Sequence, residues 1–209
     1  YSLHLMTQSA NIECVKVGMI IQELFTQSDE VKDVVRTLGL SDEFTLYSVF
    51  IMRNWENGNT EIMNIAKSVN GWGKVHAVHY IEPDTEEIRE WLLTDAVLNY
   101  VMPAYSGWDC YKKADVESLL KKNAITYKEF KGVLTIVDAI LDEGPVLGIS
   151  NIEDPKSVLL NVLNHAIKHM PLNAEDCKVV SNISDWQKEN LEDAEIASLV
   201  NKILGSGEK

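Results

Sequence analysis

Two histidines and a glutamate follow one another at intervals of three residues in NGWGKVHAVHYIE, residues 70–82. On a helix, His76, His79 and Glu82 would occupy neighbouring positions. Imidazole and carboxylate ligands together suit a divalent metal such as zinc, iron or nickel. The spacing lacks the H-E-x-x-H arrangement of a hydrolytic zinc helix, and such a ladder often arises by chance. Packing histidines are therefore the preferred interpretation, and we expect no metal or other cofactor.

A second histidine pair stands four residues apart in LNHAIKHM. The spacing of His165 and His169 is compatible with a shared metal on one face of a helix. Both residues lie off the apolar face of the helix that the pattern predicts, and no carboxylate accompanies them at helical spacing. The sequence therefore gives this pair no predicted metal site.

The stretch PAYSGWDCYKKAD concentrates side chains that are common at binding surfaces. It contains three aromatic rings, a carboxylate and a thiol within seven residues: Tyr105, Trp108, Asp109, Cys110 and Tyr111. One interpretation is a groove with aromatic anchors, and the other is a helix or loop packed into the core. Cys110 beside Asp109 is not a catalytic pair, because a nucleophilic cysteine needs a base such as histidine within reach.

Arg89 and Trp91 suggest a comparison with helical-repeat DNA glycosylases, which hold a lesion with Trp, Asp and Arg. The chain has 19 Lys and Arg residues against 32 Asp and Glu, and a formal charge of −13. Phosphate binding needs clustered cations, so neither a nucleic acid nor an anionic membrane surface is the expected partner.

Cysteine usage indicates a reducing compartment. Cys14, Cys110 and Cys177 lie far apart and form no CxxC pair, which suits free thiols and a cytoplasmic location. No apolar run reaches the roughly 18 residues that cross a bilayer. Because the chain opens on Tyr1 rather than a methionine, we expect it to be a piece of a longer protein.

The elements that must position these residues are helices. Ser28, Ser41 and Asp154 each precede an apolar pattern of helical spacing, and Pro155 is suited to a first helical position. Strand-like alternation does not persist anywhere, so we predict an all-helical protein of about ten helices.

The segment NGWG, residues 70–73, predicts a tight bend between two helices. Asn70 and Gly71 permit a left-handed backbone that ends one helix, and Gly73 lets the chain turn into the next. Trp72 is large enough to be buried as a plug at this corner. Pro83 then ends the second, short helix.

The rhythm of helices and breaks favours stacked pairs over a compact bundle. At about 40–47 residues per pair, the length fits roughly five repeats of the HEAT or armadillo kind. We therefore predict a right-handed α-solenoid forming one domain over residues 1–204, with a flexible tail at residues 205–209.

Residues 54–105 carry the pattern GWGKVHAV, a proline, then EIREWLL. This resembles a family of bacterial HEAT-repeat-like proteins with the pattern GWG-(K/R)-(I/V)-HAV, and the likeness extends to residues 126–170 and to NIECVKVGM. The resemblance implies a helical-repeat fold. Some members are labelled limonene hydroxylase, but no Rossmann glycine fingerprint, haem-thiolate setting or iron-binding facial triad is visible in this sequence.

Two functions follow as hypotheses. The first is a non-enzymatic module that binds a protein or peptide of basic or mixed charge through a repeat surface. We expect its binding surface at aromatic and acidic positions of one region: Trp72, Tyr105, Trp108, Asp109 and Tyr111. The alternative is a metal- or small-molecule-dependent enzyme with a site near His76, His79 and Asp109.

Overall fold

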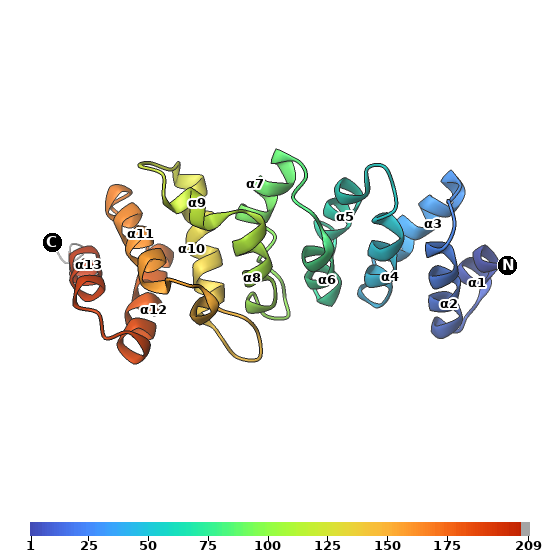
Figure 1. The fold of residues 1–209 in the computed structure, drawn as a ribbon. Coiled ribbons are helices and arrows are strands. Elements are labelled where there is room, and N and C mark those ends of the chain that lie inside the picture. The colour runs from blue at the N-terminus through green and yellow to red at the C-terminus, as the bar shows by residue number, and fades with distance from the viewer. Residues whose placement is uncertain (206–209) are drawn as a thin grey trace. The chain divides into compact units, whose positions relative to one another are not determined.

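The computed structural model of the chain describes residues 1–205, and every element in that range is helical (Figure 1). Thirteen α-helices and one short 3-10 helix follow one another, and no strand occurs among these residues. The predicted all-helical class is confirmed. Within residues 1–205 no helix combines the length and apolar character needed to cross a membrane. The predicted tail lies, apart from Gly205, outside the described residues.

The first of two compact units contains residues 1–88 and 98–102. Its helices are α1 (Ser2–Gln8), α2 (Ile12–Glu23), α3 (Asp29–Gly39), α4 (Asp42–Met52), α5 (Gly58–Ala66) and α6 (Trp72–Tyr80). Here α2 packs against α4 and α4 against α6, so these three helices form one row. Helices α3 and α5 pack against α4 from a second row, and α1 covers part of α2.

The second unit contains residues 89–97 and those from 103 onward. Its helices are α8 (Ala104–Lys113), α9 (Val116–Leu120), α10 (Tyr127–Leu141), α11 (Pro155–Lys168), α12 (Ala174–Asn190) and α13 (Ala194–Leu204), with the 3-10 helix η1 (Ile149–Asn151). Helices α8, α10 and α12 pack in succession, and so do α9, α11 and α13. The residues of α7 (Glu86–Thr94) are divided between the two units.

Most predicted helix boundaries are confirmed by the caps. Ser28 and Ser41 occupy the N-cap positions of α3 and α4. Asp154 accepts a hydrogen bond from the backbone N–H of Ser157, and Pro155 is the first residue of α11. Thr126 and Glu129 form a reciprocal capping box at the start of α10. The pattern predicted no helix at α1 or α9 and left α8 open as a helix or a loop; the structure has a helix at each of these places.

The bend before α6 has a different cause from the predicted one. Gly71 has a φ of −94°, and no glycine among the described residues has a positive φ. Instead, Asp42 of α4 lies against this segment, and its Oδ1 accepts a hydrogen bond from the backbone N–H of Gly73 at 3.0 Å. A Cβ on Gly71 or Gly73 would overlap the Asp42 carboxylate. The glycines are needed for close approach between helices, not for a left-handed turn.

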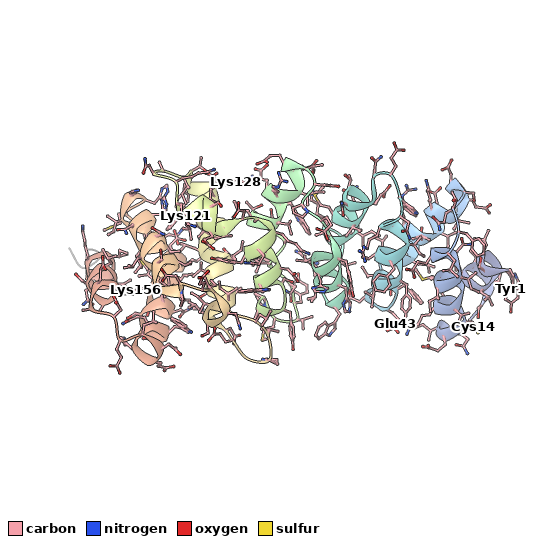
Figure 2. The ribbon with its side chains drawn as sticks, viewed as in Figure 1. Tyr1, Cys14, Glu43, Lys121, Lys128 and Lys156 are labelled. Atoms are coloured by element: carbon pink, nitrogen blue, oxygen red, sulfur yellow. The ribbon has the colours of Figure 1, made fainter. Side chains whose placement is uncertain are left out.

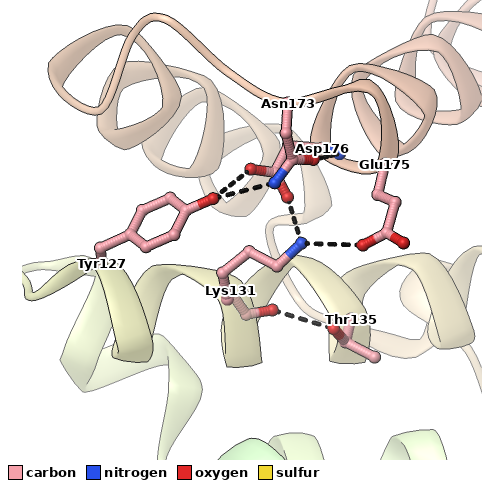
Figure 3. A network of polar contacts seen from close by, with 6 residues as sticks. All are labelled: Tyr127, Lys131, Thr135, Asn173, Glu175 and Asp176. Atoms are coloured by element: carbon pink, nitrogen blue, oxygen red, sulfur yellow. Dashed lines mark hydrogen bonds and ion pairs between the residues drawn. The ribbon is translucent and has the colours of Figure 1, made fainter.

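A buried carboxylate joins α10 to α12 (Figure 3). Asp176 is 1% exposed, and its carboxylate accepts hydrogen bonds from the Tyr127 hydroxyl at 2.9 Å and from the Lys131 ammonium. Asn173, the N-cap of α12, donates to the Tyr127 hydroxyl and accepts from the Asp176 backbone N–H. The hydrogen bond to Asp176 raises the pKa of Lys131, which therefore stays charged at neutral pH.

Replacing Lys131 with alanine should destabilise the second unit by about 2–3 kcal/mol, because the buried Asp176 charge loses its cation. Lys128, labelled in Figure 2, is a matched control on the same helix. It pairs with Glu90, and both side chains are exposed. Lys128→Ala should cost about 0–1 kcal/mol. Urea unfolding of both variants measures the difference, and equal losses would contradict the role of Asp176.

Candidate functional site

The HxxHxxE residues do not form a ladder on one helix. His76 is half-buried and His79 is exposed, both on α6, whereas α6 ends at Tyr80 and Glu82 follows it as an exposed residue. The backbone N–H of Glu82 donates to the side chain of Asn59. Burial, reinforced by the neighbouring His79, lowers the pKa of His76, while Asp42 acts weakly in the opposite direction. Residues 1–205 contain no group of three or more His, Cys, Asp or Glu side chains arranged to hold a metal ion.

The second histidine pair is divided between two structural roles. His165 is buried, and its Nε2 lies 3.1 Å from the backbone carbonyl of Leu120, which joins α11 to α9. Since a carbonyl only accepts, Nε2 carries the hydrogen and Nδ1 is the acceptor nitrogen. The ring of His169 stacks on Phe130 with centroids 4.8 Å apart. Both histidines thus contribute to packing between helices.

The predicted aromatic cluster lies on α8, and its members differ in accessibility. Tyr111 is only 2% exposed, and burial raises its pKa to about 12. Its predicted role as a surface anchor is therefore wrong. Tyr105 and Trp108 are half-buried, and the Trp108 ring stacks on Tyr111 with centroids 6.1 Å apart. Asp109 is half-buried and lies 3.8 Å from the ammonium of Lys113.

Trp72 is not the predicted buried plug. Its side chain begins α6 and is 47% exposed, with its ring 6.2 Å from that of His76. The corner is instead filled by the Asp42 carboxylate and the two glycines. Removing the indole should consequently cost less than the roughly 3–5 kcal/mol of a fully buried aromatic site. Trp91, in contrast, is buried, and Arg89 is exposed.

Sequence inspection missed an apolar stripe on the outer side of α2. Val17 and Ile20 are each 49% exposed and Leu24, which caps the helix, is 77% exposed. Their spacing of three and four residues places them on one side of the helix. Phe25 follows directly and is 63% exposed. Helix α2 also buries Val15 and Met19 on its inner side, so its apolar residues lie all around the helix. This all-round apolar pattern is visible in the sequence and indicates a helix with more than one covered side.

The next two helices of the row carry partly exposed aromatic side chains. Tyr47 and Phe50 of α4 are half-buried, and Phe50 meets Tyr80 of α6 edge to face with ring centroids 4.9 Å apart. Arg53 lies over the Tyr80 ring at 5.5 Å. We call these residues together the row face: Val17, Ile20, Leu24, Tyr47, Phe50 and Tyr80.

Charged contacts link α2 to α4 along the row face. Lys16 pairs with both Glu43 and Glu13, and its ammonium lies 6.0 Å from the Tyr47 ring centroid. The hydrogen bond to Glu43, followed by that to Glu13, raises the pKa of Lys16. One cation thus serves two carboxylates, which leaves this part of the surface acidic.

No protein-family model matches this chain, and neither does a curated protein or a solved structure. The resemblance to bacterial HEAT-repeat-like proteins stays a prediction.

His165 should make the stability of the protein depend on pH. Burial lowers its folded-state pKa below the ordinary value of 6.5, and the nearby Lys168 and His169 act in the same direction, although the Leu120 carbonyl opposes them. The unfolded state binds a proton first as pH falls, so stability is highest above pH 6.5 and declines below it, by at most about 1.4 kcal/mol per pH unit.

His165→Gln retains a donor for the Leu120 carbonyl but does not titrate. Urea midpoints measured between pH 8 and pH 5 should therefore fall less in this variant than in the wild type. Since His76 also has a lowered pKa, some pH dependence should remain in the variant. Identical pH profiles would show that His165 does not supply the effect.

Proposed function

We propose that this chain is a non-enzymatic helical-repeat module, of the HEAT or armadillo kind, that binds a protein or peptide. The order of helix packing supports the repeat architecture: alternate helices pack in succession in two rows of the second unit and in the row of α2, α4 and α6 in the first. Helices α3 and α5 of the first unit are joined by the ion pair of Arg36 and Glu61. Stacked helical pairs bury a continuous core in this way and present one set of helices as an extended binding surface.

The row face is the observation that carries the binding function. Three consecutive helices of one row place exposed or half-exposed aliphatic and aromatic side chains on their outer side. Exposed apolar surface with charged residues beside it marks sites of protein interaction more often than it marks the surface of an isolated domain. Aromatic side chains such as Tyr47, Phe50 and Tyr80 supply most of the energy at such sites.

The alternative of an enzyme near His76, His79 and Asp109 has weaker support. Glu82 lies beyond the helix that carries the two histidines, and Asp109 lies beside Lys113. Neither carboxylate, Glu82 nor Asp109, is therefore placed as the enzyme hypothesis requires. The net charge of −13 favours a partner of basic or mixed charge for the row face.

A peptide-display selection against the wild-type protein tests the binding function. Selected peptides should bind Phe50→Ala more weakly by about 10–30-fold, the range of a moderate hot spot. Leu147→Ala is the control, because Leu147 is an exposed apolar residue of the second unit. Circular dichroism melts verify that both variants fold.

Two results would contradict the proposal. The selection could yield no peptide that binds the wild-type protein above an unrelated acidic protein. Alternatively, the selected peptides could bind Phe50→Ala and the wild type with equal affinity, which would place their site away from the row face.

A further inference from the structure

Helix α2 has one side that no other described helix covers. Helix α1 packs closely on the opposite side, where a Cβ on Gly18 would come within 2.9 Å of Met6 and where Gln22 donates to Ser2. Helix α4 contacts a different side of α2, where Lys16 of α2 forms an ion pair with Glu43 of α4. Between these two edges lie Val17, Ile20 and Leu24. We call these three residues the α2 stripe.

A hollow of about 390 Å³ opens at the C-terminal end of the α2 stripe. Leu24 and Phe25 form part of its apolar wall, and the indole of Trp55 forms another part. Trp55 is held in place because its Nε1 donates to Gln27 at 2.9 Å and the Lys32 ammonium lies 5.4 Å from its ring centroid. The hollow therefore combines three apolar side chains, those of Leu24, Phe25 and Trp55, with polar and charged neighbours.

Carboxylates surround the stripe and the hollow. Glu13 and Glu43 share the single cation of Lys16, and Glu23 forms no ion pair among residues 1–205. Glu23 and Glu56 both line the hollow, where Lys32 is the one lysine. The rim thus carries more negative than positive charge, so a ligand with basic groups beside its apolar groups is complementary to it.

We infer that the α2 stripe and the adjoining hollow bind an amphipathic helix of a partner protein whose apolar side is flanked by lysine or arginine. The inference rests on the proposed function and names the partner's chemistry. Apolar groups spaced by three and four residues along one helix match the seam of a second helix packed alongside it. A second copy of this chain fits less well, because it would bring the same acidic rim against Glu13 and Glu23.

Synthetic peptides of about 18 residues, long enough to fold as helices on binding, provide the probe. One carries leucines at helical spacing with lysine flanks, a second has the same leucines with glutamate flanks, and a third is a scrambled form of the first. Fluorescence anisotropy measures their affinity for the full chain. The lysine-flanked helix should bind at least about tenfold more tightly than either of the other two.

Variants locate the site. Ile20→Asp should weaken the lysine-flanked helix by about tenfold or more, whereas Leu40→Asp, a matched change at an exposed leucine that caps α3, should leave it unchanged. The double variant Glu13→Gln with Glu23→Gln should weaken binding and reduce its dependence on salt. If Ile20→Asp lowers the melting temperature, Val17→Ser with Ile20→Ser replaces it.

Three results would overturn the inference. Equal binding of the lysine-flanked and scrambled peptides would show attraction by charge alone, and equal binding to Ile20→Asp and wild type would place the site elsewhere. A wild-type dimer in sedimentation analysis that Ile20→Asp abolishes would identify a second copy as the occupant. In each case, the proposed binding function would still hold if the display-selected peptides bound Phe50→Ala more weakly than the wild type.

Discussion

Side-by-side packing of short helices within a row is the interaction on which the rest of this structure depends. Most of the helices span between 5 and 15 residues, a length at which an isolated helix is marginal in water. Each is stabilised by burying one side against its neighbours, as Val49 and Met52 of α4 are buried in the first unit and Phe130 and Leu134 of α10 in the second. The side chains that do not face a neighbouring helix remain exposed to solvent.

Polar joints fix how closely neighbouring helices approach. In the first unit the Asp42 carboxylate of α4 accepts a hydrogen bond from the backbone at the N-terminal end of α6. Unpaired backbone N–H groups and the helix dipole favour an anion at such an end. In the second unit the buried Asp176 carboxylate links α10 and α12 through Tyr127 and Lys131. Each carboxylate lies in the first turn of its own helix and bonds a neighbouring helix. Each one therefore favours one particular pairing of helices.

The row face follows from this packing. Gly18 and Met19 of α2 face the core, and no helix among residues 1–205 covers the apolar residues on the far side of α2. On α4 and α6 the aromatic rings of Phe50 and Tyr80 contact each other and remain half-exposed. Exposing a surface of this composition to water costs free energy, which is the physical reason for proposing that a partner covers it.

The sequence by itself determined the fold class and most helix boundaries, because caps such as Ser28, Ser41 and Asp154-Pro155 act on the backbone within a few residues. It did not determine the sides of the helices that face solvent. Trp72 was predicted to be a buried plug and is exposed, whereas Tyr111, named among the binding-surface residues, is buried. The burial of a ring, and the need for glycine beside Asp42, depend on which distant helix packs there. Only the tertiary structure decides that contact.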